Sequence, residues 1–297
     1  MILLDDKNKI LNDTLQKFLS TDSESLEPVD VTLADFDSVL YHMSPVEGAK
    51  SSLKISIGWP AFKEMQACGA DDVLKRIYGD MITDTEKGYD FSIVVDSEAL
   101  NEEKDEVVSK VALLKRNVFA APFERAFRQQ KEGGSEETMK IQYREDSSIW
   151  LQARHDRVTV VFSTTFQDAD DITLANKVFL QEFVDAKKKV REAPQVIYSW
   201  KDPPSELDGT GAEAADNISY ITFVLFPRHY DGDKEDNCIN MLQMFRDYFH
   251  YHIKCSKAYL HTRMRARVST SLKVLNRAKP EVKKDKKTFS GKTFAKR

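Results

Sequence analysis

The sequence has 297 residues, a net charge of −4 and 41% hydrophobic residues, and a chain of this size and composition suits one or two globular domains with a real core. Its three cysteines, Cys68, Cys238 and Cys255, are scattered without a CxxC pair, so the sequence indicates neither a disulfide framework nor a zinc module. The N-terminal apolar stretch is too short for a signal peptide, and no apolar run approaches the roughly 18 residues of a membrane span, so we expect a soluble, cytoplasmic protein.

The first half of the chain alternates predicted helices and strands. Apolar residues at helical spacing predict an amphipathic helix over 6–19. The following predicted elements are strands at 29–44 and 52–59, one or two short helices over 60–79, a strand at 89–96, and a helix over 102–131 that Pro122 should kink or restart. Asp35 and Asp37 should alternate on a strand and face one side. Paired carboxylates can be catalytic, but these have no basic or nucleophilic companion motif, so we expect surface or loop residues.

The second half follows a similar plan after a linker-like break at 132–137. Strands are predicted at 138–145, 148–155 and 157–166, where they should form a three-stranded meander, and again at 195–200 and 218–227. Asp168, Asp170 and Asp171 precede a predicted helix, where acidic residues are favoured by the helix dipole without any metal.

Together these patterns predict an α+β fold. We expect two similar α/β domains, each an antiparallel sheet with helices packed on it, followed by a long C-terminal helix. The expected boundaries are 1–121 for the first domain, 122–235 for the second, 236–279 for the long helix and 280–297 for a basic tail.

The predicted C-terminal helix is unusually long. No proline occurs between Asp236 and Pro280, and forty-odd helical residues span roughly 65 Å at 1.5 Å per residue. An apolar stripe with steps of mostly four residues runs along it. The first half should pack on its own sheet, whereas an exposed stripe on the second half needs a partner protein. The expected partner-subunit interface consists of Ile253, Leu260, Met264, Val268, Leu272 and Leu275.

Several patterns in this region resemble metal or nucleotide sites without meeting their requirements. His250 and His252 lie about 200° apart on a helix and cannot share one ion, and His252 with Cys255 supplies two ligands where zinc needs four. Asp233 and Asp236 lack the glycine and closing glutamate of an EF-hand. The GKT at 291–293 lacks the first glycine of a P-loop. We therefore predict no catalytic residue, no cofactor and no metal.

Charge is distributed unevenly along the chain. Residues 251–297 carry a net charge of +13, and the other 250 residues carry −17. A basic arm on an acidic body indicates an anionic partner, although a solvated tail is the alternative. A module that binds nucleic acid or anionic lipid is a further alternative, but the arm's aromatic residues are not interleaved as a stacking platform. The candidate contact residues are Arg263, Arg265, Arg267, Lys273 and Arg277, followed by Lys283, Lys284, Lys286 and Lys287.

Several segments resemble a known family. VTLADFDSVLYH, GADDVLKRIYG, DRVTVVFSTTF, SYITFVLFPRH and FRDYFHYHIKCSKAYLHTRMRARVSTSLKVLNRAKP are similar to the 34 kDa subunits of the actin-related protein 2/3 complex, and the resemblance covers essentially the whole chain.

The resemblance implies a non-catalytic scaffold and actin-filament-binding subunit. In that family, two similar α/β domains precede a long helix, which pairs with subunit 4 at the centre of the complex. The complex nucleates a daughter actin filament from the side of a mother filament, and the two subunits together meet that mother filament. The actin-related proteins of the complex bind ATP, and this subunit does not. Charge and position, rather than the resemblance, select Arg263, Arg265, Arg267, Lys273 and Arg277 as filament contacts.

Overall fold

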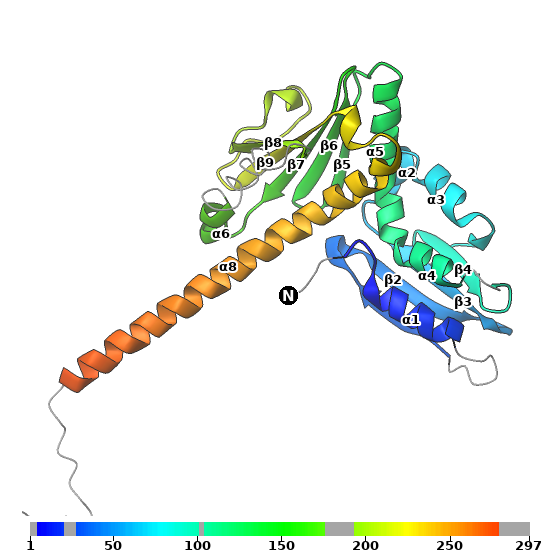
Figure 1. Ribbon diagram of the computed structural model, residues 1–297, viewed down its shortest axis with the longest axis horizontal. Coiled ribbons are helices and arrows are strands. Elements are labelled where there is room, and N and C mark those ends of the chain that lie inside the picture. The colour runs from blue at the N-terminus through cyan, green and yellow to red at the C-terminus, as the bar shows by residue number, and fades with distance from the viewer. Residues whose placement is uncertain (1–4, 21–27, 101–103, 176–192, 279–297) are drawn as a thin grey trace, which may run out of the picture. The chain divides into compact units, whose positions relative to one another are not determined.

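The computed structural model describes residues 5–20, 28–100, 104–175 and 193–278 (Figure 1). The chain divides into two compact units, Met1–Ile253 and Lys254–Arg297. The long helix α8, Glu235–Ala278, contributes residues to both units. The expected basic tail at 280–297 lies outside the described residues.

The first sheet is an antiparallel meander near the N-terminus. Its strands lie in chain order, and their bounds are β1 Val31–Ala34, β2 Leu40–Val46, β3 Ala49–Gly58 and β4 Phe91–Asp96. A two-residue turn joins β2 to β3, and Gly48 in this turn has a φ of 79°, which glycine adopts without strain. The helices of this half are α1 Lys9–Ser20, α2 Phe62–Ala67, α3 Ala70–Tyr78 and α4 Lys104–Ala112.

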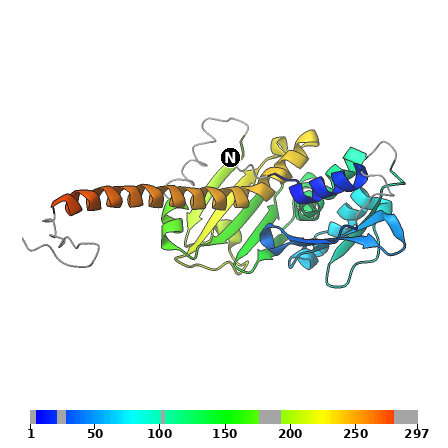
Figure 2. The same cartoon turned by 90° about the horizontal axis from the view of Figure 1, so that it is seen from below.

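The predicted N-terminal helix is confirmed as α1. Its apolar residues at helical spacing, Leu11, Leu15, Phe18 and Leu19, are all buried. The helix packs on α4 and lies along one face of the first sheet, as Figure 2 shows. The one or two short helices predicted for 60–79 are confirmed as α2 and α3, and Gly79, with a φ of 46°, caps the C-terminus of α3.

Helix α5, Leu114–Lys131, connects the two sheets and corrects one prediction. We expected a kink or restart at Pro122, but α5 runs through Pro122 and the break from α4 falls earlier, at Leu113. Helices α2 and α3 contact α5, as do strands of the second sheet, so most of its residues are buried. Tertiary packing on several sides explains why the helix tolerates the hydrogen bond that a proline removes. The expected domain boundary at 121/122 falls inside this helix.

The second sheet has the strand order β5-β6-β7-β9-β8 and is antiparallel throughout. Its strands are β5 Thr138–Arg144, β6 Ser147–Ala153, β7 Val158–Thr165, β8 Gln195–Trp200 and β9 Ile218–Leu225. The predicted meander is confirmed as β5, β6 and β7, and β9 lies between β7 and β8. The short helix α6, Ala169–Leu174, follows β7 with Asp170 and Asp171 in its first turn, as expected. Single 3₁₀ turns occur at η1 Phe36–Ser38, η2 Gly79–Met81, η4 Ser205–Leu207, η5 Pro227–His229 and η6 Gly232–Lys234.

The first part of α8 belongs to the core of the larger unit. Phe245 packs edge-to-face on Phe223 of β9 with ring centroids 4.7 Å apart, and Phe249 is 1% exposed. Arg116 of α5 is buried and reaches α8, where it donates to Asp236 Oδ1 at 2.7 Å and to Asn240 Oδ1 at 2.6 Å. Two antiparallel sheets with packed helices and a long C-terminal helix thus form the predicted α+β fold.

Candidate functional site

Helix α8 exposes a row of large apolar side chains after Ile253. Leu260, Met264, Val268, Leu272 and Leu275 have exposed fractions between 45% and 64%. Large apolar side chains exposed in a contiguous row mark an interaction surface in a soluble protein. We call these five residues the apolar face of α8.

Helical geometry gathers these five residues on one side of the helix. At about 100° per residue they fall within an arc of about 120°, which also contains His261 and Ser271. The same geometry places the five candidate cations in the remaining arc of about 200°. A shallow groove of about 480 Å³ runs where the two sides meet, lined by Met264, Val268 and Leu272 together with Arg265, Ser269, Lys273 and Asn276.

The cations of this segment have no carboxylate near them along the helix. No aspartate or glutamate occurs between Asp247 and Glu281. Within the described residues, no ion pair involves Arg265, Arg267, Lys273 or Arg277, and each is exposed. We call these four residues with Arg263 the basic face of α8. An uncompensated row of cations favours an acidic surface and speeds encounter with it.

Arg263, a member of the basic face, is anchored to its own helix by the side chain of Tyr259. It donates to the hydroxyl of Tyr259 at 3.0 Å, and its guanidinium lies 5.6 Å from the centre of the Tyr259 ring. The two residues are one helical turn apart, where side chains meet. Tyr259 therefore orients Arg263, and both side chains remain exposed.

The structure separates one predicted interface residue from the rest. Ile253 is 1% exposed and belongs to the core of the larger unit. Sequence periodicity could not distinguish it from Leu260, because both fit the same stripe. Ile253 is therefore withdrawn from the expected partner interface, which begins at Leu260. The expected contacts Lys283, Lys284, Lys286 and Lys287 lie outside the described residues.

The histidines that precede the exposed segment are engaged by aromatic rings. His252 lies 4.1 Å from the ring of Tyr248, and His250 lies 6.0 Å from that of Phe166. Among the described residues no group of three or more His, Cys, Asp or Glu side chains is arranged to hold a metal ion. None of the described helices is long and apolar enough to cross a membrane.

The structure corrects the expected strand position of Asp35 and Asp37. We expected them to alternate on a strand and face one side, as surface or loop residues. Instead Asp35 caps the 3₁₀ turn η1 by accepting from the Phe36 N–H at 2.7 Å, and Asp37 sits inside that turn with a φ of 67°. The Asp37 side chain is largely covered, with 12% of its surface exposed.

Three cations surround Asp37 and come from distant parts of the chain. Lys115 Nζ lies 3.1 Å from Oδ2, Arg246 Nη1 lies 3.5 Å from Oδ1, and Arg144 also pairs with Oδ1. Burial opposes ionisation, but these three charges outweigh it and hold the pKa of Asp37 below its usual range. Asp247 on α8 lies in the same cluster. Burial and the charge of Asp37 raise the pKa of Asp247 to about 6.

This cluster joins η1, α5, β5 and α8, so it ties the two sheets together. Two of its members, Asp37 and Arg246, are 209 residues apart along the chain. No local motif marks such a cluster, so sequence reasoning missed it. A signal existed only in the composition, because lysine and arginine inside the predicted apolar runs at 115–116 and at 246 indicate buried cations that require an acidic partner.

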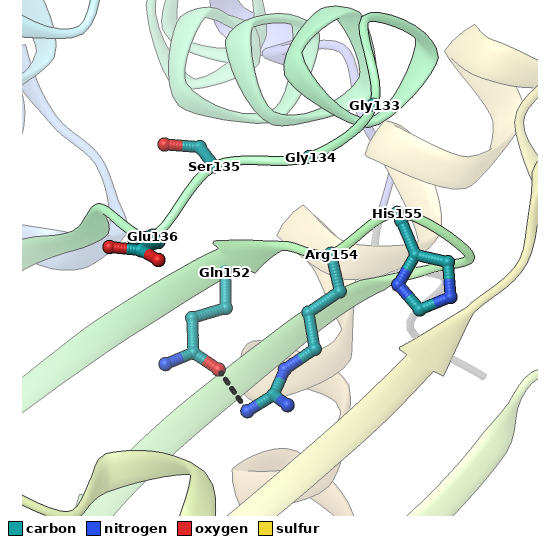
Figure 3. A pocket seen from close by; sticks show the side chains of 7 residues that line it. All are labelled: Gly133, Gly134, Ser135, Glu136, Gln152, Arg154 and His155. Carbon is teal, nitrogen blue, oxygen red and sulfur yellow. Dashed lines mark hydrogen bonds between the residues drawn. The ribbon is translucent and has the colours of Figure 1, made fainter.

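A second pocket illustrates a surface without these features. It has a volume of about 460 Å³ and lies at the turn Gly133–Gly134 (Figure 3). The backbone N–H groups of Gly133, Gly134 and Ser135 all donate within the fold, so they cannot cradle an anion. Gln152 and Arg154 lie side by side in Figure 3 and are joined by a hydrogen bond of 3.4 Å. This pocket supports no chemistry beyond an ordinary polar surface.

Comparison with known proteins agrees with the sequence resemblance. The family model described as "Arp2/3 complex, 34 kD subunit p34-Arc" matches residues 55–282. A protein of Schizosaccharomyces pombe named actin-related protein 2/3 complex subunit 2 is 42% identical, and the alignment covers 99% of both chains. A protein of the same name from Dictyostelium discoideum is 41% identical, again over 99% of both chains. These names describe complex subunits and mention no catalytic activity.

Proposed function

The chain belongs to the family of 34 kDa p34-Arc subunits of the Arp2/3 complex, and from this membership we propose that it is a non-catalytic scaffold and actin-filament-binding subunit of that complex. It pairs with subunit 4, contacts the other subunits, and meets the mother filament during nucleation of branched actin. Its location in this proposal is the cytoplasmic actin cytoskeleton, including cell projections. The single observation that carries the proposal is the exposed, two-sided segment of α8 after Ile253.

The apolar face of α8 is proposed to bind subunit 4. Each of its five side chains is about half exposed or more, and burying one Leu or Met side chain stabilises by roughly 1.5–3 kcal/mol. Five such residues within a narrow arc match the way one helix packs along another. Their burial against a helical partner would remove the largest exposed apolar row that the described residues contain.

The basic face of α8 is proposed to contact the acidic filament. Its five side chains carry no acidic neighbour on the helix, and each exposed ion pair contributes only about 0–1 kcal/mol. Several together orient and accelerate encounter while remaining sensitive to salt. The two faces thus divide one helix between a permanent partner and a reversible one.

The test of the pairing is a charge placed on the apolar face. Met264→Asp and Leu260→Asp should weaken pairing with subunit 4 more than tenfold, because each loses a buried apolar side chain and buries a carboxylate without a partner. Ala266→Asp is the matched control, since it introduces the same residue into the same helix but on the basic side. Co-expression with the other subunits followed by size-exclusion chromatography measures assembly. Normal assembly of the Met264→Asp complex would contradict the proposal.

The same preparation tests the alternative use of the basic arm. Co-sedimentation with actin filaments, with RNA and with anionic vesicles, over a salt series, separates filament binding from binding to nucleic acid or lipid. The proposal expects filament binding that survives at a salt concentration where the other two are lost.

A further inference from the structure

A threonine hydroxyl lies in the middle of the basic face of α8. The side chain of Thr270 is exposed, and its hydroxyl donates to the carbonyl oxygen of Ala266 at 2.9 Å. At about 100° per residue, four of the five cations of the basic face lie within about 60° of Thr270 around the helix axis. These four are Arg263, Arg267, Lys273 and Arg277. A negative group on the Thr270 oxygen would therefore stand among most of the cations of this face.

Two arginines precede Thr270 at spacings that suit an acidic substrate cleft. Arg267 lies three residues before it and Arg265 lies five residues before it. Residues two apart share one side of an extended chain, whereas on a helix they lie about 200° apart. In an extended conformation the two guanidinium groups can therefore pair together with carboxylates of an enzyme cleft. Thr270 is the one serine or threonine of α8 with arginine at both spacings.

The helix has low intrinsic stability around Thr270. The sequence Val-Ser-Thr-Ser at 268–271 places four residues of modest helix propensity in a row. A threonine hydroxyl that bonds to the carbonyl four residues before it destabilises a helix slightly. Every residue from Ala258 to Arg277 is exposed, so little tertiary packing opposes local opening in the free chain. The segment can therefore extend into an enzyme cleft without disturbing the core.

We propose that Thr270 accepts a phosphoryl group from ATP in the cleft of an arginine-directed protein kinase, and that the phosphate weakens filament binding by the basic face. In the transfer, Oγ1 of Thr270 forms a bond to the γ-phosphorus of ATP. The bond from that phosphorus to the β–γ bridging oxygen breaks and releases ADP, and the hydroxyl proton passes to a carboxylate of the kinase. The choice of acceptor rests on this chain alone, whereas the effect on filaments rests on the proposed function.

The phosphate changes the charge and the pairing of the basic face. A phosphothreonine carries a charge of about −1.5 to −2 near pH 7 and three acceptor oxygens. Arg267 and Lys273 lie three residues to either side of Thr270, where side chains meet on a helix, so both can donate to the phosphate. Cations that pair with the phosphate are then less available to an acidic filament. Pairing through the apolar face should be unaffected, because Thr270 lies outside its arc.

The first test is phosphorylation of the full-length chain by protein kinase B with ATP, followed by mapping of the phosphate by mass spectrometry. Thr270 should carry most of the incorporated phosphate, and Thr270→Ala should remove it. Thr262 is the internal control, because it is exposed and its hydroxyl makes the same kind of bond, to the Ala258 carbonyl at 2.8 Å, but it lacks the two arginines. No phosphate on Thr270, or equal phosphate on Thr262, would overturn the proposal.

Two arginine variants test whether the spacing selects the acceptor. Arg267→Gln should lower the initial rate of transfer to Thr270 about tenfold, because it removes a charge-assisted hydrogen bond to the kinase. Arg263→Gln is the matched control, since it removes the same charge from the same face but lies seven residues before Thr270. Its rate of transfer should equal that of the unaltered chain. Equal losses in the two variants, or no loss in Arg267→Gln, would refute selection by this spacing.

The second test measures the effect of a negative charge at Thr270 on filament binding. The assembled complex with Thr270→Glu is compared with the complex carrying Thr270→Gln, which has the same size and no charge. Both should assemble normally by size-exclusion chromatography. At low salt the Thr270→Glu complex should co-sediment with actin filaments about threefold more weakly than the Thr270→Gln complex, and high salt should reduce the difference. Equal binding at low salt would refute the effect of the phosphate.

The outcomes distinguish failure of the filament role from failure of its regulation. If the unaltered complex does not bind filaments, the filament role fails and the regulation fails with it. Phosphate mapping on the free chain still decides whether Thr270 is the acceptor. If the unaltered complex binds filaments and Thr270→Glu binds as well as Thr270→Gln, the regulation alone fails.

Discussion

Helix α8 has two parts with the same periodicity and opposite surroundings. Before Lys254, the side chains of Leu242, Phe249 and Ile253 are at most 1% exposed, whereas after it Met264 and Leu275 are 64% and 60% exposed. Apolar residues recur at intervals of about four in both parts. The comparison teaches that periodicity determines which side chains share a face of a helix. Whether that face is covered depends on the neighbours that the rest of the chain supplies.

The largest expected difference in stability between the two parts of α8 comes from truncating a buried side chain of the first part. Phe249→Ala should lower the free energy of unfolding by about 3–5 kcal/mol, because it leaves a cavity between β-sheet and helix. The equivalent truncation Leu275→Ala should change it by no more than about 0.5 kcal/mol in the free chain. Chemical denaturation of the two variants measures the difference. Equal losses would mean that the second part of α8 is covered within the chain.

A smaller difference in stability is expected when a buried arginine and an exposed arginine are each replaced by leucine. Arg246 is buried beside Asp37 and stacks over the ring of Tyr143 at 5.2 Å. Arg246→Leu should therefore cost about 3 kcal/mol of unfolding free energy, since it breaks a buried ion cluster. Arg267→Leu on the basic face should cost about 0.5 kcal/mol or less. Thermal denaturation monitored by circular dichroism can rank the pair, and a similar shift in both would remove the distinction between buried and exposed cations.

The pH dependence of stability should sharpen the same contrast. The pKa of Asp247 is raised to about 6 in the folded chain, so the folded state keeps a proton that the unfolded state releases near pH 4. The unfolding free energy should therefore fall as pH rises from about 4 to 6, by about 2 kcal/mol from this group. The pKa of Asp37 is lowered in the folded chain, so the stability that its carboxylate contributes is lost only as pH falls below this window.

Asp247→Asn is the variant that isolates this contribution. The difference between its stability and that of the unaltered chain should change with pH between 4 and 6 and be level above 7. Asp72→Asn, with its exposed carboxyl group, serves as the control. A constant difference across the window would show that Asp247 titrates normally.

The smallest effect on stability is expected on the basic face, where the functional effect should be large. Lys273→Glu with Arg277→Glu reverses one i, i+4 pair of the basic face, of which Lys273 also lines the groove beside the apolar face. The complex should assemble and melt normally, because both side chains are exposed. Binding to filament sides and branch density should fall, most visibly at low salt. Single-filament microscopy measures branch density after the complex is checked by size-exclusion chromatography.

A matched variant controls for substitution itself. Lys273→Gln with Arg277→Gln removes the charges without reversing them, and should give an intermediate branch density. Branch density equal to that of the unaltered complex over the whole salt range would contradict the filament contact.

Much of the fold followed from local patterns in the sequence. Alternation predicted the meander of β5, β6 and β7, and Leu11, Leu15 and Phe18 predicted α1, because period and burial coincide in these elements. The position of β9 between β7 and β8 could not be predicted, since strand order depends on contacts distant in sequence. The continuous passage of α5 through Pro122 was missed for the same reason, because packing on several sides outweighs one lost hydrogen bond.

The candidate site could likewise be predicted only in part from the sequence. The exposed residues of α8 were identified from charge and periodicity, but Ile253 could not be separated from Leu260 by any local pattern. The ion cluster around Asp37 was hidden because its cations Lys115, Arg144 and Arg246 come from three different elements. Sequence patterns describe one element at a time, and this cluster exists only where four elements meet.

The order of strands in the second sheet also determines when the sheet can be completed. β8 pairs with β9 and with no other described strand, and β9 supplies the open edge of β7 along eight residue pairs. A ribosome must therefore synthesise residues up to Leu225 before β8, made some 20 residues earlier, has anything to join. Until then β7 presents an apolar edge on which other chains can add. Messages truncated between β8 and β9 should consequently yield aggregating fragments, whereas those truncated within the second part of α8 leave every strand paired.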